Sequence, residues 1–141
     1  MREILFRGKR QDNGEWIEGC LLRVYERVCR GVYQPREYAI QSAEEWIAPP
    51  LVVAETVGQF TGLTDKNGKR IFEGDICKTY FESYTHSWEE VGVVTEFCGA
   101  YGIESAEGKH FRAFINQSVY TRSHEVIGTI YDNPELLEDE Q

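Results

Sequence analysis

The chain has 141 residues, a length that allows one domain or two very small ones. Its content of 41% apolar, 13% aromatic and 28% charged residues is typical of a folded protein and excludes wholesale disorder. The formal net charge of −9 argues against a nucleic-acid partner, and the lack of any apolar run near the roughly 20 residues of a membrane-spanning helix argues against a membrane protein.

Short runs of β-branched and aromatic residues, separated by Gly, Asn, Asp or Pro, recur along the whole chain and predict a mainly β fold. In chain order, we expect strands at Glu3–Arg7, Glu15–Val24, Val28–Tyr33, Glu55–Thr61, Asp75–Phe81, Val91–Phe97, Phe111–Ile115 and Glu125–Tyr131.

Two short helical segments accompany these strands. Ser42–Ile47 predicts one helical turn, which Pro49 and Pro50 would end. At the other end of the chain, Asn133 is a capping residue and Pro134 suits the first helical position. We therefore expect a short C-terminal helix, followed by a solvated acidic tail.

Two Asn-Gly pairs predict tight hairpin turns, because both positions of such a turn need a positive φ. They are Asn13-Gly14 and Asn67-Gly68, and each is expected to lead into a strand that ends at Glu-Gly. Either an internal duplication or shared hairpin chemistry explains this similarity. A further turn is expected at Gly74-Asp75, which redirects the chain into a strand that begins near Ile76.

The Gly74-Asp75 turn and a downstream Gly92-x-Val94 resemble the pattern of SH3-like small barrels. In those barrels, Gly-Asp opens one bent strand and Gly-x-Val lies in its partner. Strongly coiled strands need positions without a Cβ for bulges and close crossings. We therefore expect one or more SH3-like small barrels.

Three blocks of sequence together resemble the YopX-like family of proteins encoded by phages, prophages and related mobile elements. These blocks are Arg2–Lys9, Gln59–Ile76 and Glu125–Leu137. The resemblance implies a mostly β, SH3-like protein in the cytoplasm of an infected or lysogenic bacterium, and it implies no activity. The charged opening Met1–Arg7, which does not read as a signal peptide, agrees with a cytoplasmic location.

The domain organisation has two interpretations. Residues 1–141 form a single YopX-like domain, or an N-terminal β subdomain (1–50) packs on a central and C-terminal SH3-like subdomain (51–141). The Pro49-Pro50 break is the candidate boundary in the second interpretation.

The acidic charge is concentrated in the second part of the chain. Residues 1–56 carry 8 basic and 9 acidic side chains, whereas residues 57–141 carry 7 and 15. A nucleic-acid partner is therefore not expected. The alternative function is nucleic-acid binding by a small basic face in the N-terminal part of the chain. Its residues would be Arg2, Arg7, Lys9, Arg10, Arg23, Arg27 and Arg30.

The cysteines show no metal-binding or disulfide pattern. None of the four forms a C-x-x-C pair, and the charged opening predicts a reducing compartment. We expect buried free thiols at Cys20, Cys29, Cys77 and Cys98.

Side chains with catalytic potential are scattered. His86, His110 and His124 lie in separate segments, and a His–carboxylate enzyme site is the third hypothesis, which requires the fold to gather them. Asp65 and Asp75 flank turns, where carboxylates commonly accept hydrogen bonds from backbone amides. No pattern indicates a catalytic set, a metal or a cofactor.

The aromatic residues suggest a surface for binding another protein, because Tyr and Trp supply rigid contact area at interfaces. We name Tyr84, Trp88 and Tyr101 as a candidate interaction surface. The leading hypothesis is a non-catalytic protein–protein interaction module with an unknown host or phage partner, and we expect a homo-oligomer.

Overall fold

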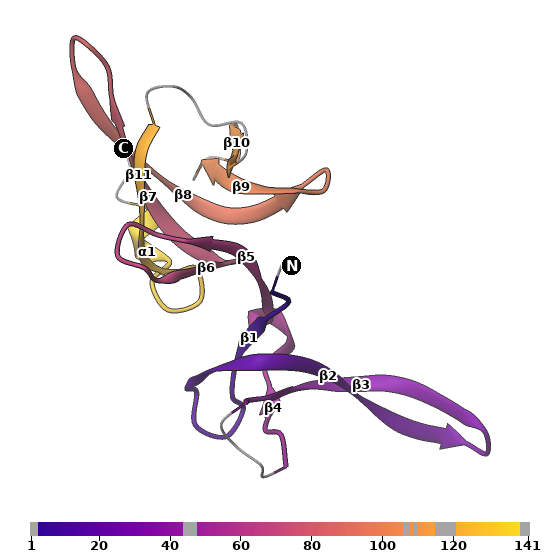
Figure 1. Cartoon of the computed structure of the whole chain (residues 1–141). Helices are drawn as coiled ribbons and strands as arrows, with labels where there is room; N and C mark the ends of the chain where they lie inside the picture. Colours follow the sequence, from indigo (N-terminus) through magenta and orange to yellow (C-terminus); the bar gives the residue numbers. More distant parts are fainter. Residues whose placement is uncertain (1–2, 44–47, 106–107, 109, 115–120, 139–141) are drawn as a thin grey trace. The chain divides into compact units, whose positions relative to one another are not determined.

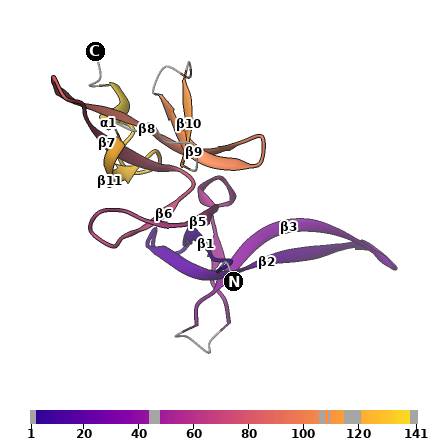
Figure 2. The same ribbon diagram turned by 45° about the horizontal axis from the view of Figure 1, so that its top comes forward.

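The computed structural model describes residues 3–43, 48–105, 108, 110–114 and 121–138. The chain divides into two compact units, Met1–Phe60 and Thr61–Gln141, each built mainly of antiparallel strands (Figures 1 and 2). The prediction of a mainly β fold is confirmed. The division lies within a strand, ten residues after the Pro49-Pro50 break suggested by the sequence.

The first unit is a sheet of antiparallel strands. In spatial order its strands are β4 (Leu51–Val52), β3 (Val32–Gln41), β2 (Trp16–Cys29), β1 (Phe6–Lys9) and the first residues of β5 (Gly58–Thr64), with a 3₁₀ turn at Ala54–Thr56. Buried Ala39, Ile40, Val52 and Phe60 form its apolar interior. A Cβ at Gly8 would lie only 3.1 Å from the Val52 Cβ, so the missing side chain lets β1 lie close to that residue.

The β2–β3 hairpin is much longer than the rest of this sheet. Figures 1 and 2 show it as a twisted two-stranded ribbon that extends beyond the other strands of its unit. It turns at Arg30-Gly31, where Gly31 has φ +76°. We call residues Arg23–Arg36 the arm, and every residue from Tyr25 to Arg36 is exposed.

The second unit begins with the β5–β6 hairpin and continues as a five-stranded sheet. Its elements are β6 (Arg70–Phe72), β7 (Asp75–Glu82), β8 (Ser87–Phe97), β9 (Ala100–Ser105), β10 (Phe111–Ala113), β11 (Thr121–Thr129) and α1 (Glu135–Glu138). The sheet has the order β10-β9-β8-β7-β11, so β7 to β10 form a meander and β11 returns to pair with β7.

Two glycines allow the sharp bend of this sheet. A Cβ at Gly92 would lie 2.5 Å from the Glu104 carbonyl oxygen, and one at Gly102 would lie 2.3 Å from the Arg112 carbonyl oxygen. Neighbouring backbone could not come so close to any other residue type. The inward face then encloses a core of Ile71, Cys77, Val94 and Phe114, with Tyr101, Ile103 and Val126 packed against it.

The barrel expected from the SH3-like pattern is not closed. A sheet closes into a barrel only when its two edge strands pair. Among the residues that the structure describes, β10 pairs with β9 and β11 pairs with β7, and the two edge strands do not pair with each other.

Several local predictions need correction. Val28–Tyr33 was expected to be one strand, but it contains the arm tip, because Arg30-Gly31 reverses the chain. The short strand β4 and the strand β9 were not predicted, whereas β6 is the strand expected between Asn67-Gly68 and Gly74. The C-terminal helix is present as α1. The Asn133 side chain, expected to cap this helix, has its oxygen bonded to the N–H of Thr129 at the end of β11.

The expectation of buried thiols is wrong for three cysteines. Only Cys77 is buried, whereas Cys20, Cys29 and Cys98 are exposed because they lie on the β2–β3 ribbon and in the β8–β9 turn. The helical turn predicted at Ser42–Ile47 includes residues 44–47, which lie outside the described part of the chain. Within that part, no helix is long and apolar enough to cross a membrane.

Candidate functional site

The turn residues named from the sequence lie at chain reversals. Gly14 has φ +73° between β1 and β2, where the Asn13 side-chain oxygen accepts a hydrogen bond from the Glu15 N–H at 2.9 Å. Gly68 has φ +81° between β5 and β6, next to Asn67.

Gly74 and Asp75 form the turn from β6 into β7. Gly74 has φ +89°, and the buried Asp75 carboxylate accepts a hydrogen bond from the Phe72 N–H at 2.8 Å. Because this bond closes the turn over three residues, Asp75 has a structural role here.

Asp65 organises the β5–β6 turn and links it to β11. Its Oδ1 accepts hydrogen bonds from the N–H groups of Asn67 and Lys69, both at 2.9 Å, and its Oδ2 accepts one from Val126 at 3.0 Å. Burial raises the pKa of this carboxyl, but the three backbone hydrogen bonds and the Lys69 charge outweigh it and lower the pKa below the usual value.

The proposed aromatic surface is divided between two ends of β8. Tyr84 is fully exposed in the β7–β8 turn, and the Trp88 ring stacks on Phe81 with the ring centroids 5.2 Å apart. Tyr101 pairs with Glu96 near the other end of β8 and packs against the core. These three residues therefore do not form one continuous patch.

The arginines considered for a basic face are also divided. Arg7 is buried beside Trp16, and Arg10 forms an ion pair with Asp12 at 2.8 Å. Arg23, Arg27 and Arg30 instead lie on the arm. Arg2 is outside the described residues.

Arginine and tyrosine share one face of the arm. Arg23 pairs with Tyr38, and Arg27 pairs with Tyr33, so the members of each pair lie on the same face. Tyr25 lies between the two arginines at the strand period of two and therefore joins this face. The Arg23 guanidinium donates a hydrogen bond to the Tyr38 hydroxyl at 2.9 Å. Val28 and Val32 add exposed apolar area near the tip.

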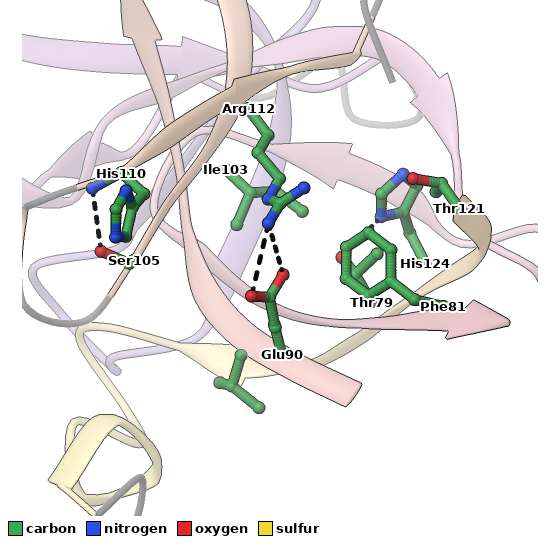
Figure 3. Close-up of a pocket in the computed structure, with 10 residues that line it drawn as sticks. Thr79, Phe81, Glu90, Ile103, Ser105, His110, Arg112, Thr121 and His124 are labelled. Atoms are coloured by element: carbon green, nitrogen blue, oxygen red, sulfur yellow. Dashed lines mark hydrogen bonds and ion pairs between the residues drawn. The ribbon is translucent and has the colours of Figure 1, made fainter. Parts of the chain in front are cut away.

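The second unit contains a pocket of about 100 Å³ on the inward face of its five-stranded sheet. The strand register explains its lining. Thr79 of β7 lies between Glu90 of β8 and His124 of β11, and Ile103 of β9 lies opposite Arg112 of β10. Directly paired residues share a face, so side chains from all five strands meet in one hollow (Figure 3).

One wall of the pocket carries an ion pair. Arg112 Nη2 lies 3.3 Å from Glu90 Oε2 and 3.5 Å from Oε1, and both side chains are about half exposed. The same guanidinium lies over the buried Phe81 ring, 5.0 Å from the ring centroid. Figure 3 shows Arg112 and Glu90 directed toward each other across this wall.

A hydroxyl–imidazole pair lies next to the ion pair, because Thr79 is the direct partner of Glu90 on one side and of His124 on the other. Thr79 is buried, and its Oγ1 lies 2.8 Å from His124 Nδ1. The His124 ring also meets Phe114 edge-on, with the centroids 5.1 Å apart. Burial lowers the pKa of His124, so its imidazole is neutral at pH 7.

The three histidines do not converge. His124 and His110 both line the pocket, with the His110 N–H donating to the Ser105 hydroxyl at 3.2 Å, whereas His86 stacks on Trp88 near the β7–β8 turn. No cluster of three or more His, Cys, Asp or Glu side chains suited to a metal ion occurs among the described residues.

Sequence reasoning missed the pocket, although one signal pointed to it. Trp88, Glu90, Gly92 and Val94 alternate along β8 on the inward face. Glu90 is a charged residue within that series, whereas Glu96, the next residue on the same face, is exposed near the end of the strand. A carboxylate at an inward position is a reason to look for a polar site.

Comparison with known proteins gives matches that cover nearly the whole chain. A family model described as YopX protein matches residues 5–138. The crystal structure of protein EF1440 from Enterococcus faecalis is similar over 97% of this chain and 99% of that chain, with 25% sequence identity and a TM-score of 0.54. No curated protein sequence matches.

Proposed function

The chain belongs to the YopX protein family, and on this basis we propose that it is a non-catalytic protein-interaction module that self-associates through the β2–β3 arm. It acts, in this proposal, in the cytoplasm of a bacterium that carries the phage or prophage encoding it. The exposed apolar side chains of the arm are the observation that carries the proposal.

These side chains are large and close together in the ribbon. Tyr25, Val28, Val32 and Tyr33 are 55%, 57%, 49% and 61% exposed. Removing such a side chain from water contributes about 1.5–3 kcal/mol when burial is complete. Tyr33 and Val32 are successive residues of one strand and point to opposite faces, so both faces of the ribbon carry exposed apolar side chains. Grouped apolar exposure of this kind marks interaction sites in soluble proteins.

Charge complementarity favours a second copy of this chain as the partner. The arm carries four arginines and one glutamate, so its net charge is +3. Residues 61–141 carry 7 basic and 15 acidic side chains, so their net charge is −8. The basic arm of one copy and the acidic second unit of another attract each other, which speeds and orients association.

We also propose that the second unit is an open relative of the SH3-like barrels. Three features support this relation: Gly74-Asp75 opens the bent strand β7, Gly92 lies at a close backbone approach in its partner β8, and β11 returns to the first strand of the meander. This relation concerns the fold alone, because one fold serves many functions, and the proposed function rests on the arm.

The test is the mass of the protein in solution, measured by light scattering and sedimentation. Self-association predicts a species heavier than the 16.3 kDa chain, weakened by high salt because screening reduces the attraction between arm and acidic unit. The double change Tyr25→Ser with Tyr33→Ser should give the monomer. Tyr84→Ser removes a still more exposed tyrosine from a different hairpin and serves as the control. A monomer at all concentrations of the unaltered protein would refute self-association.

A second candidate function is nucleic-acid binding, which the Arg–Tyr face of the arm favours. A two-stranded ribbon fits the major groove, and aromatic rings stack on unpaired bases. Fluorescence anisotropy with labelled duplex and single-stranded DNA at physiological salt is the assay. Binding that is lost on Arg23→Glu and Arg27→Glu, but kept on Arg122→Glu in the acidic unit, would favour this function over self-association.

A further inference from the structure

We propose that the pocket in the second unit binds an uncharged, single-ring heterocycle of the pyrimidine-base type. This inference does not depend on the arm, because every residue that lines the pocket lies between Thr79 and His124. Its basis is the size of the cavity and the arrangement of polar groups around it.

The size of the cavity allows one ring. Its volume is about 100 Å³, somewhat below the ~150 Å³ of an engineered cavity that accommodates benzene. A pocket for a drug-sized ligand is several times larger, at about 300–1,000 Å³. A single six-membered ring with one edge toward solvent therefore matches this volume better than a two-ring purine does.

The charges of the pocket favour a neutral ligand. Glu90 and Arg112 neutralise each other, and the neutral His124 imidazole adds no charge. A carboxylate or phosphate would meet Glu90, and an ammonium group would meet Arg112. Each charged ligand would be repelled by one member of the pair and attracted by the other, so the pair gives little net attraction for a charge.

The ion pair presents a donor and an acceptor side by side. Its N–O distances of 3.3 and 3.5 Å are longer than the roughly 2.7–2.9 Å of a tight pair. A ligand edge with a carbonyl next to an N–H can therefore bind both groups, accepting from Arg112 and donating to Glu90. This is the edge that uracil and related pyrimidines carry.

Apolar and polar groups complete the recognition. Ile103 supplies apolar surface for the ring, and the buried Phe81 ring lies beneath the Arg112 guanidinium. The Thr79 hydroxyl, held by His124, lies beside the ion pair, because Thr79 pairs directly with Glu90. A mostly apolar lining with a few directed polar groups is the usual composition of a small-molecule site.

The test is a titration of the full chain with uracil, followed by NMR chemical shifts of backbone amides and by calorimetry. We expect shifts that concentrate on the pocket strands. 1,3-Dimethyluracil keeps the ring but has no N–H, so it should bind at least about tenfold more weakly, as expected for loss of a hydrogen bond to a charged group.

Matched variants connect the binding to the ion pair. Glu90→Gln and Arg112→Gln should each weaken uracil binding about tenfold or more. Glu89→Gln is the control, because Glu89 precedes Glu90 on the same strand and pairs with Lys78 on the outward face. Thermal melting of each variant checks that it is folded.

Three results would overturn the proposal. The first is the absence of uracil-induced shifts at pocket residues. The second is uracil binding by the Glu90→Gln and Arg112→Gln variants that is as tight as binding by the unaltered protein. The third is tighter binding of acetate or imidazolium than of uracil. None of these results depends on whether the protein self-associates, so failure here and failure of the arm proposal are distinguishable.

Discussion

Replacing Asp65 by asparagine tests how the β5–β6 turn is held against β11. Asparagine keeps an oxygen for the Asn67 and Lys69 N–H groups, which both bond Oδ1. It puts an NH₂ group where Oδ2 now accepts from the Val126 N–H at 3.0 Å, so two donors face each other. Loss of one hydrogen bond to a charged acceptor costs about 1.5–3 kcal/mol, and the donor–donor contact adds to it, so we expect the variant to lose about 2–4 kcal/mol.

The assay is urea denaturation at about pH 7 and again at about pH 3. The pKa of Asp65 is lowered in the folded protein, so the folded state binds fewer protons than the unfolded state. This contribution is complete above the ordinary value of 3.8 and is lost as the pH falls through the folded pKa. The difference between the two proteins should therefore shrink at the lower pH.

Asp12→Asn is the matched control for Asp65→Asn. Asp12 lies in the similar Asn13-Gly14 turn but is exposed and bonds the Arg10 side chain, so its replacement should leave the urea midpoint nearly unchanged. An Asp65→Asn variant as stable as the unaltered protein at neutral pH, or an undiminished difference in acid, would refute the role given to this carboxylate.

Three further predictions concern backbone conformation and burial. Gly68→Val should cost about 1–2 kcal/mol, seen as a lower melting temperature, because φ is +81° there; unchanged melting would contradict the turn. Gly102→Ala should lower the urea midpoint more than Gly99→Ala does. A Cβ at Gly102 would lie 2.3 Å from the Arg112 carbonyl oxygen, whereas one at Gly99 would meet open space. The reverse order would show that the sheet accommodates the added Cβ at little cost in stability. The lowered pKa of His124 means that stability falls as the pH drops below about 6.5, where the unfolded state takes up the proton first. Melting between about pH 7 and pH 5 should thus depend less on pH in His124→Gln, in which Glu90, His110 and Arg112 still line the pocket; equal slopes would contradict this.

Local features of the fold could be predicted because their causes lie within a few residues. Asn67-Gly68, Gly74-Asp75 and Pro134 act through backbone conformation, which neighbouring residues determine. The strand at Asp75–Phe81 agrees with β7 to within one residue for the same reason.

The arm was misassigned for a reason that is also local. Val28 to Tyr33 contain enough β-branched and aromatic residues to suggest one continuous strand, and Arg30-Gly31 is not among the stronger hairpin pairs such as Asn-Gly. Once the chain reverses there, residues on both sides are left on a ribbon without a covering layer. Exposure of Cys29 follows from that reversal and not from its residue type.

The pocket could not be predicted because it depends on pairing between distant segments. Thr79 and His124 are 45 residues apart and become neighbours only when β11 pairs with β7. Arg112 reaches Glu90 across β9, a strand that the sequence did not reveal. Without that strand, no counting of alternate residues places the two charges on the same face.

The alternation of side chains along β8 also distinguishes two neighbouring glutamates. On β8, Glu89 and Glu90 are adjacent in sequence and have opposite orientations, because successive strand residues point to opposite faces. Glu89 pairs with Lys78 on the outward face, an exposed ion pair of the kind that contributes little to stability. Glu90 is directed into the pocket, where its ion pair with Arg112 is about as exposed as the Lys78–Glu89 pair, so the two glutamates differ in what surrounds them more than in their exposure. A comparison of Glu89→Gln with Glu90→Gln therefore asks whether the charge on the inward face has a use that the charge on the outward face lacks.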